Sequence, residues 1–241
     1  MQIIWLDTID STNSEALRRL PELISGTVLA AREQTAGRGQ RGNSWFTEAG
    51  KNLTFSIVLK WEEGAFPVRD AHWLNYLSSY VVLQFLADHG VQAQVKWPND
   101  IYVGRRKICG MLIENTLGTA GLAASVIGIG LNVNQTVFPQ LANATSMALC
   151  TGLCFDLEPA LQDLADRFEH SMPLLFDPQL FQSYSDQLFQ KGVQARYHDL
   201  LTDRTYTGII QGVEADGRLR IRDLDTSQDH LYRFKEVGYI L

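Results

Sequence analysis

Residues 37–45 read GRGQRGNSW, and the prediction of the fold and of its binding site starts from this stretch. Its three glycines let the backbone approach a ligand closely, and successive backbone N–H groups can surround an anion. The two arginines add forked donors that suit a carboxylate or a phosphate. We therefore predict an anion-binding loop here. A flexible surface hairpin is the competing interpretation of this stretch taken alone.

The same stretch matches two familiar phosphate-binding motifs only in part. Gly37, Gly39 and Gly42 fit the pattern G-x-G-x-x-G, but a dinucleotide-binding fingerprint opens a helix directly after a strand. Here residues 52–59 (NLTFSIVL) follow, and their alternation predicts a strand. The P-loop motif also fails, because Asn43 stands where the phosphate-binding lysine is required. The sequence therefore predicts neither kind of site.

Composition and charge limit the kinds of partner that the chain can bind. The 241 residues carry a net charge of −6, with 45% hydrophobic and 20% charged residues. This is an ordinary globular composition, and the acidic balance gives no broad basic field for nucleic acid or anionic lipid. The apolar runs are too short to span a bilayer, and the N-terminus does not read as a signal peptide. We predict no nucleic-acid partner, no membrane partner and a cytoplasmic location.

The three cysteines, Cys109, Cys150 and Cys154, form no disulfide framework. An odd number without an accompanying His or Cys cluster suits a reducing compartment. We predict buried free thiols; a disulfide or a metal site formed by Cys150 and Cys154 is the alternative.

Hydrophobic periodicity predicts an α+β chain in which mixed helices and strands give way to short strands near residue 190. A helix starts within residues 10–20, where Thr12 and Glu15 have capping-box spacing. The other predicted elements are strands at 3–6, 27–31 and 52–60, a helix at 68–89, antiparallel strands over 94–103, 107–114 and 122–129, and helices at 157–170 and 178–190. Short strands at 205–214, 218–223, 229–235 and 237–241 end the chain. We predict two domains, residues 1–190 and residues 191–241.

Four polar clusters fall at predicted strand ends or in loops, at residues 11–13, 34–45, 96–100 and 105–110. Each has a structural explanation when taken alone, such as a helix cap, a solvated ion pair or a charged turn. A strand-to-helix junction also presents N–H groups and hydroxyls to an anion or a polar ring. Taken together, the clusters indicate a local anion site in an acidic chain.

These clusters resemble the motifs of the class I biotin–protein ligases. The resemblance rests on IDSTN (9–13), Gln34 with AGRGQRG (36–42) and Trp45, KWPND (96–100), RKICGMLIE (106–114) and GIGLNVN (128–134). The motifs occur in the family's order, and such a set is highly specific. It implies an α+β fold: a catalytic domain of the class II aminoacyl-tRNA synthetase and biotin ligase type, with a mixed sheet and helices, then a small C-terminal SH3-like β-barrel.

The resemblance implies a two-step ligase reaction. Biotin and ATP give biotinyl-5′-AMP and pyrophosphate, and a lysine of a biotin carboxyl carrier protein domain then attacks the mixed anhydride. ATP and biotin are the implied substrates, and Mg²⁺ would be carried mainly by phosphate oxygens, with no dedicated metal ligands. The implied partner is a biotin-dependent carboxylase subunit. Several family members dimerise through sheet edges, and the sequence leaves a homodimer open.

The resemblance also assigns residues to roles. Lys107 and Arg38 would hold the carboxylate and the phosphate, with Asp100 as the acidic catalytic neighbour. The implied biotin site comprises Ser11, Thr12, Asn13, Gln34, Arg38, Gly39, Gln40, Lys107 and Gly110. The implied ATP and adenylate site comprises Gly37, Arg38, Gly39, Gln40, Arg41, Trp45, Asn99, Asp100 and Asn132.

Two departures from the family pattern carry expectations of their own. Many bacterial members have an arginine where this chain has Gln40, so we expect the adenylate to be held less tightly here unless Arg41 compensates. The first ligase motif begins by residue 9, so we expect no N-terminal DNA-binding domain and no repressor role.

Two other functions compete with biotin ligation. A lipoate–protein ligase shares the architecture and the acyl-adenylate strategy, although residues 37–45 and 96–100 favour biotin. A non-catalytic nucleotide- or peptide-binding protein is the alternative from a different class.

Overall fold

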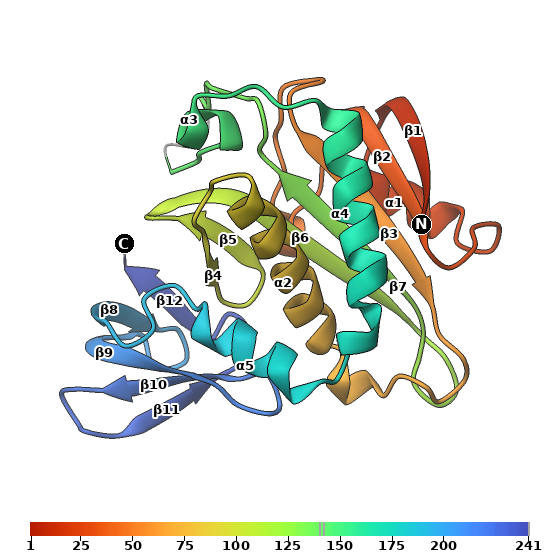
Figure 1. Cartoon of the computed structure of the whole chain (residues 1–241). Coiled ribbons are helices and arrows are strands. Elements are labelled where there is room, and N and C mark those ends of the chain that lie inside the picture. The colour runs from red at the N-terminus through yellow and green to blue at the C-terminus, as the bar shows by residue number, and fades with distance from the viewer. Residues whose placement is uncertain (140, 142, 241) are drawn as a thin grey trace.

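The computed structural model describes residues 1–139, 141 and 143–240, and at Arg41 only the backbone. Its largest element is a seven-stranded sheet with the order β1-β2-β3-β7-β6-β5-β4 (Figure 1). The strands are β1 (Gln2–Ile9), β2 (Thr27–Gln34), β3 (Leu53–Lys60), β4 (Gln94–Lys96), β5 (Asp100–Val103), β6 (Arg106–Leu117) and β7 (Leu122–Leu131). β1 and β2 run parallel and the other neighbouring strands antiparallel. The predicted mixed sheet is confirmed.

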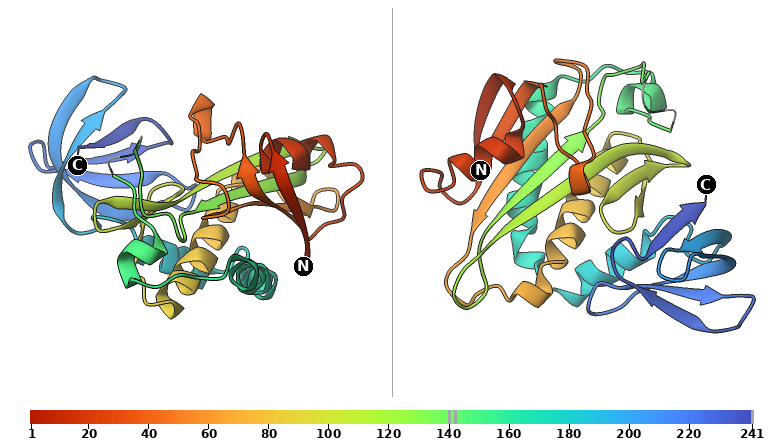
Figure 2. Two further views of the ribbon diagram at one scale, coloured as in Figure 1. Left: turned by 90° about the horizontal axis from the view of Figure 1, so that it is seen from above. Right: turned by 180° about the vertical axis from the view of Figure 1, so that it is seen from behind.

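The helices divide between the two faces of this sheet. α2 (Trp73–Asp88) and α4 (Leu157–Ser171) cover one face, while α1 (Thr12–Arg18) and the 3₁₀ turn η1 (Gln40–Gly42) lie on the other (Figure 2). The remaining helical elements are α3 (Met147–Thr151), α5 (Pro178–Asp186), η2 (Val68–Asp70) and η3 (Met172–Leu174). The face with α1 and η1 is therefore the more open one, and it carries the candidate site.

Apolar side chains on both faces of β3 hold the sheet between two cores. Phe55 and Ile57 belong to the large core shared with α2 and α4. Val58 points the other way and packs with Ala16 of α1 and Leu29 of β2. Each fully buried side chain of this size contributes about 1.5–3 kcal/mol. The two cores therefore fix the central strands that form the floor of the site.

The C-terminal part is a five-stranded antiparallel sheet with the order β11-β10-β9-β8-β12. Its strands are β8 (Gln194–Asp199), β9 (Arg204–Val213), β10 (Leu219–Asp223), β11 (Asp229–Tyr232) and β12 (Val237–Ile240). No ladder joins β11 to β12 within the described residues, so the sheet is not a closed barrel, which fits an SH3-like fold. The predicted fold class is confirmed. The boundary between residues 190 and 191 stays a prediction.

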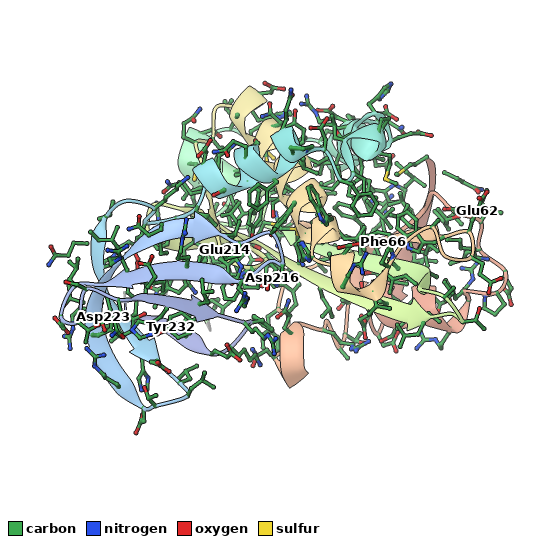
Figure 3. All side chains as sticks on the ribbon, turned by 90° about the horizontal axis from the view of Figure 1, so that it is seen from below. Glu62, Phe66, Glu214, Asp216, Asp223 and Tyr232 are labelled. Carbon is green, nitrogen blue, oxygen red and sulfur yellow. The ribbon has the colours of Figure 1, made fainter. Side chains whose placement is uncertain are left out.

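Buried carboxylates organise the strand ends of this C-terminal module. Asp223 and Tyr232 lie within its sheet (Figure 3). Although burial alone would raise the pKa of Asp223, the backbone N–H groups of Asp225 and Thr226 and the guanidinium of Arg204 lower it to about 2. The carboxylate is therefore a fixed acceptor that holds the β10–β11 loop against β9.

Some predicted element boundaries differ from the structure. The predicted helix at 68–89 consists of η2 followed by α2, and the predicted helix at 178–190 ends at Asp186. The chain leaves the helix there because Leu188 forms a bridge with Val95 of β4. The sequence pattern also misses β8, whose apolar positions are too few to stand out.

The cysteine prediction is partly corrected. Cys109, Cys150 and Cys154 are all free, but Cys150 is only partly buried and Cys154 is exposed, so the predicted burial of these two is wrong. Burial raises the pKa of the Cys109 thiol, which makes it a core residue and not a nucleophile. No helix of the described residues is long and apolar enough to cross a bilayer.

Candidate active site

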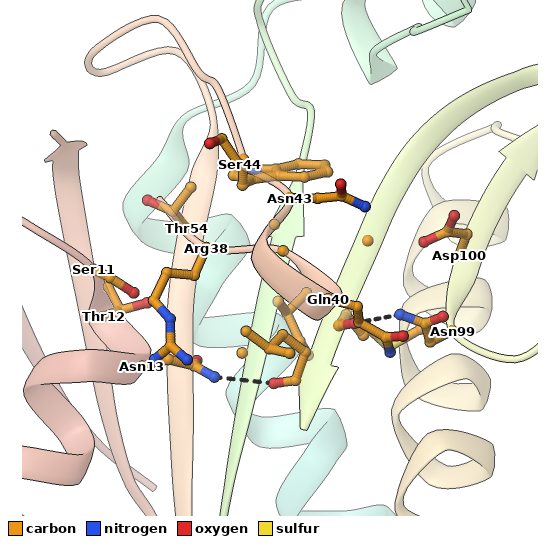
Figure 4. Close-up of a pocket in the computed structure, with 18 of the residues that line it drawn as sticks. Ser11, Thr12, Asn13, Arg38, Gln40, Asn43, Ser44, Thr54, Asn99 and Asp100 are labelled. Atoms are coloured by element: carbon orange, nitrogen blue, oxygen red, sulfur yellow. Dashed lines mark hydrogen bonds between the residues drawn. The ribbon is translucent and has the colours of Figure 1, made fainter. Parts of the chain in front are cut away.

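A cavity of about 260 Å³ opens on the α1 face of the seven-stranded sheet (Figure 4). Residues of β3, β6 and β7 form its floor, and its walls come from the start of α1, the hairpin at 37–45, the segment before β5 and the C-terminal module. Ser11 and Thr12 lie on the opposite side of it from Asn99 and Asp100. The predicted site residues that line it are Ser11, Thr12, Asn13, Gln34, Arg38, Gly39, Gln40, Trp45, Asn99, Asp100, Lys107 and Gly110.

The start of α1 forms one end of the cavity. Ser11 is the N-cap and accepts from the backbone N–H of Ser14, so the predicted cap at Thr12 is wrong by one position. Thr12 is already helical, and its backbone N–H donates to Gln34 Oε1 at 2.8 Å. Its hydroxyl lies 3.2 Å from the same oxygen and 2.8 Å from Ser56 Oγ. This end therefore presents ordered donors and acceptors to a small polar group.

Asn13 extends this polar cluster toward the arginine of the hairpin. Its Oδ1 lies 2.6 Å from Ser56 Oγ, and its Nδ2 donates to Glu114 Oε2 at 2.9 Å. The same carboxylate accepts two hydrogen bonds from Arg38, at 2.7 and 3.1 Å. A forked pair of this geometry orients the guanidinium as well as neutralising it. Arg38 is thus held ready beside the cavity by a carboxylate of β6.

Two glycines opposite each other in the sheet make a flat floor for Trp45. Gly110 of β6 and Gly130 of β7 are register partners. A Cβ at Gly130 would lie 2.3 Å from Trp45 Cε2, and one at Gly110 would lie 3.0 Å from both Trp45 Cζ3 and Lys107 Nζ. The indole therefore rests on the backbone itself. Its N–H is buried and has no hydrogen-bond partner within the described residues, which leaves a donor for a ligand.

Lys107 and Asp100 form the charged side of the cavity. Lys107 Nζ lies 2.7 Å from Asp100 Oδ1, with the side chains 31% and 22% exposed. The ammonium also lies 5.4 Å from the ring centroid of Trp45. Nearby, burial lowers the pKa of Lys96, whose ammonium contacts the rings of Tyr102 and Tyr239. The ion pair is partly shielded from water, so the attraction between the Lys107 ammonium and an incoming anion would be strong.

The hairpin at 37–45 lines the cavity and is also held by backbone hydrogen bonds within itself. The N–H of Trp45 donates to the carbonyl of Gly37 at 2.8 Å, and the N–H of Gly39 donates to Asn43 at 2.7 Å. A Cβ at Gly37 would lie 2.3 Å from the carbonyl oxygen of Trp45, so glycine is needed there. Of the N–H groups of residues 37–42, that of Gly39 is therefore engaged within the hairpin. Contact of the other N–H groups of this stretch with an anion stays a prediction.

Residues 5–132 match the model of the biotin/lipoate A/B protein ligase family. The chain belongs to this family. It is 32% identical to the biotin–[acetyl-CoA-carboxylase] ligase of Paracoccus denitrificans, over 88% of this chain and 91% of that protein. It is 41% identical to the bifunctional ligase/repressor BirA of Escherichia coli, over 53% of this chain and 39% of that protein. The biotin protein ligase of Aquifex aeolicus in complex with biotin and ATP shares the fold, with a TM-score of 0.80, 24% identity and coverage of 98% and 97% of the two chains.

Three predicted site residues of this ligase-family chain are not among the described residues that line the cavity. Gly37 lines a second groove, which it shares with Arg38 and Glu114. Asn132 is buried, and its side-chain N–H₂ donates to the carbonyl of Thr145 at 2.9 Å. The side chain of Arg41 lies outside the described residues. Direct contact of these three with a ligand stays a prediction.

The sequence reasoning also missed residues that this ligase-family cavity includes. Gly128 and Gly130 stand in a quoted motif, and their spacing of two in a strand could have placed both on the ligand face. Thr54 lies within a strand pattern that reads as core. Phe234 and Lys235 come from the C-terminal module, and no motif connects them to the rest of the site.

Proposed function

We propose that this chain is an ATP-dependent biotin–protein ligase, which activates biotin as biotinyl-5′-AMP and transfers it to a lysine of a biotin carboxyl carrier protein. The observation that carries the proposal is that one cavity joins the buried polar cluster at α1 to two cationic side chains, Arg38 and Lys107. The cluster suits a small polar ring, and the cations suit a carboxylate and a phosphate. The Paracoccus relative supports it by its name, and the Aquifex structure by the biotin and ATP it contains.

In the first step, a carboxylate oxygen of biotin attacks the α-phosphorus of ATP, the bond between this phosphorus and the oxygen bridging to the β-phosphorus breaks, and pyrophosphate leaves. Two anions must meet in line, so cations have to offset their repulsion. We assign this role to Arg38 and Lys107, which would exchange Glu114 and Asp100 for the substrate anions. Ser11, Thr12 and Gln34 would hold the ureido ring.

In the second step, the amine of the carrier lysine attacks the carbonyl carbon of the mixed anhydride. The bond to the phosphate oxygen breaks, AMP leaves, and the proton of the attacking amine passes to a phosphate oxygen or to water. Lys107 would again stabilise the charge that develops on the leaving oxygen. Asp100 is the carboxylate assigned to this step, through its ion pair with Lys107.

Mg²⁺ would enter this site mainly on the phosphates of ATP. Among the described residues, no group of three or more His, Cys, Asp or Glu side chains is placed to hold a metal ion. Asp100 is the one carboxylate in the described lining of the cavity. Because Mg²⁺ keeps several waters and is commonly held through substrate phosphates, this lining fits the ion.

The partner assigned to this activity is a biotin carboxyl carrier protein domain of a biotin-dependent carboxylase. The name of the Paracoccus relative, a ligase acting on acetyl-CoA carboxylase, supports this class of partner. The net charge of −6 argues against a nucleic-acid partner. We also propose a cytoplasmic location, where ATP and the carrier occur. Homodimerisation stays open.

The proposed function is tested by biotin-dependent exchange of labelled pyrophosphate into ATP. Exchange that requires biotin would support the proposal, and its absence would exclude biotin ligation and leave a lipoate ligase or a binding protein. Supplying biotin or lipoate with ATP and a purified carrier domain then separates the two ligases. The mass added to the carrier identifies the acid, and lipoylation alone would overturn the biotin assignment.

The grip on the adenylate is tested by Gln40→Arg. Gln40 lines the cavity, and its Oε1 is buried without a hydrogen-bond partner in the described part of the chain. An arginine adds a charged donor toward a phosphate, so we expect biotinyl-5′-AMP to dissociate about ten-fold more slowly, measured by stopped flow. Gln92→Arg adds the same charge at an exposed position outside the cavity and should change nothing. If biotinyl-5′-AMP dissociates from Gln40→Arg as fast as from the original chain, Gln40 does not limit how tightly the adenylate is held.

A further inference from the structure

The C-terminal module contributes part of the wall of the ligand cavity. Phe234 and Lys235 lie in the turn between β11 and β12, and both line the cavity that Arg38 and Lys107 also line. The N–H of Glu236 donates to the carbonyl of Arg233 at 3.0 Å and closes this turn. The turn therefore brings one more cationic side chain to a site assigned to anionic substrates.

Several contacts fix the module against the segment that carries Asn99 and Asp100. Trp97 Nε1 donates to the carbonyl of Gly217 at 3.1 Å, and the rings of Trp97 and Phe234 lie 6.5 Å apart. The ammonium of Lys96 lies 5.1 Å from the ring of Tyr102 and 5.0 Å from that of Tyr239. These contacts join β4, β5 and β12. The place of Lys235 relative to the charged side of the cavity is therefore set by the packing.

Lys235 occupies a backbone conformation that favours glycine. Its φ is +65°, in the left-handed region, where a residue with a Cβ is disfavoured. Glycine would relieve this strain, yet the position carries a long cationic residue that lines the cavity. Strained non-glycine residues gather at functional sites, where the surrounding structure holds them in place.

The charges around the cavity leave part of ATP unmatched. Among the described side chains that line it, the charged ones are Arg38, Lys107, Lys235 and Asp100. Arg38 and Lys107 are assigned to the biotin carboxylate and the α-phosphate. The β- and γ-phosphates carry further negative charge, and a lysine ammonium is a compact charge that adapts to a group that departs as pyrophosphate.

We propose that Lys235 binds the β- and γ-phosphates of ATP, so that the C-terminal module supplies the leaving-group end of the nucleotide site. This inference rests on the proposed function, because it takes ATP as the substrate. Lys235 contacts neither the adenylate nor the biotin ring. Loss of the Lys235 ammonium therefore weakens the binding of ATP and leaves the binding of AMP and of biotin unchanged.

Lys235→Gly tests this, because it removes the ammonium and relieves the positive φ, so the variant should fold at least as stably as the original chain. Calorimetry should show the Kd of ATP raised about ten-fold in low salt and the Kd of AMP unchanged. Lys235→Arg should retain the affinity for ATP. Ser227→Gly is the matched control, because Ser227 has a φ of +60° in the same module, is exposed and does not line the cavity.

The outcomes separate this inference from the proposed function. An ATP affinity that Lys235→Gly leaves unchanged overturns the inference, even if biotin-dependent exchange occurs. If Lys235→Gly raises the Kd of ATP and the Kd of AMP by the same factor, the assignment of Lys235 to the β- and γ-phosphates is overturned. If the original chain shows no biotin-dependent exchange, the proposed function fails, while calorimetry with ATP alone still tests Lys235. A chain that does not bind ATP overturns both.

Discussion

Replacing Lys107 with alanine is expected to lower the rate of biotin-dependent pyrophosphate exchange at least ~100-fold, the usual cost of removing one donor from a charge-stabilising site. The substitution removes the cation placed for the reacting anions. It also leaves Asp100, 2.7 Å away in the original chain, as an uncompensated carboxylate that repels them. Exchange should therefore fall through both effects, while thermal stability changes little because both side chains are partly exposed.

Two further variants separate these effects and control for the loss of an ion pair. Asp100→Asn combined with Lys107→Ala removes the repulsion but not the loss of the cation, so it should recover only part of the rate. Lys191→Ala is the control, because Lys191 pairs with Asp186 at 2.7 Å, its side chain is about as exposed as that of Lys107, and it does not line the cavity. A normal rate in Lys107→Ala, or an equal loss in Lys191→Ala, would contradict the role given to Lys107.

Replacing Gly128 with alanine is expected to weaken biotin binding at least ~100-fold and to lower the stability of the fold by about 1–3 kcal/mol. A Cβ at this position would lie 2.1 Å from Asn13 Oδ1. Asn13 cannot move aside cheaply, because its Nδ2 is bonded to Glu114 and to the carbonyl of Leu112. The added methyl group must therefore displace the whole polar cluster at the start of α1.

Calorimetry with biotin and thermal unfolding together measure this effect. Gly118→Ala serves as the control at the far end of β6 and β7, where the new Cβ would meet only the Ala123 side chain, at 3.3 Å, and Gly121 and Ala123 backbone atoms beyond it. The control should bind biotin normally. If Gly128→Ala also binds biotin normally, then Asn13 and its neighbours are not the site of the ring, and that assignment must be abandoned.

The general fold was predictable because its elements carry local signals. The alternation at residues 52–59 and the meander from residue 94 to 131 appear in the structure close to where they were predicted. The missed strand β8 and the shortened α5 depend instead on tertiary pairing, with β9 and β12 in one case and with β4 in the other. Tertiary pairing of this kind does not show in the hydrophobic pattern of a short polar segment.

The candidate site was predictable where one motif supplied both the residue and its surroundings. Asp100 and Gly110 are register partners, as the paired strands imply, and Lys107 reaches Asp100 from beyond a register shift between Ile101 and Tyr102. The hairpin donors were harder to predict, because Gly39 and Trp45 direct their N–H groups back into the hairpin. Lys235 could not be found at all, since the packing of Trp97 and Phe234 brings the C-terminal module to the cavity.

The carboxylate of Glu114 accepts hydrogen bonds from both Asn13 and Arg38, and this shared acceptor has a thermodynamic consequence. A biotin ring that orders Asn13 changes the carboxylate that restrains Arg38, and an anion that draws Arg38 away changes the restraint on Asn13. Any coupling between two binding events is reciprocal. The factor by which biotin alters the affinity for the nucleotide must therefore equal the factor by which the nucleotide alters the affinity for biotin.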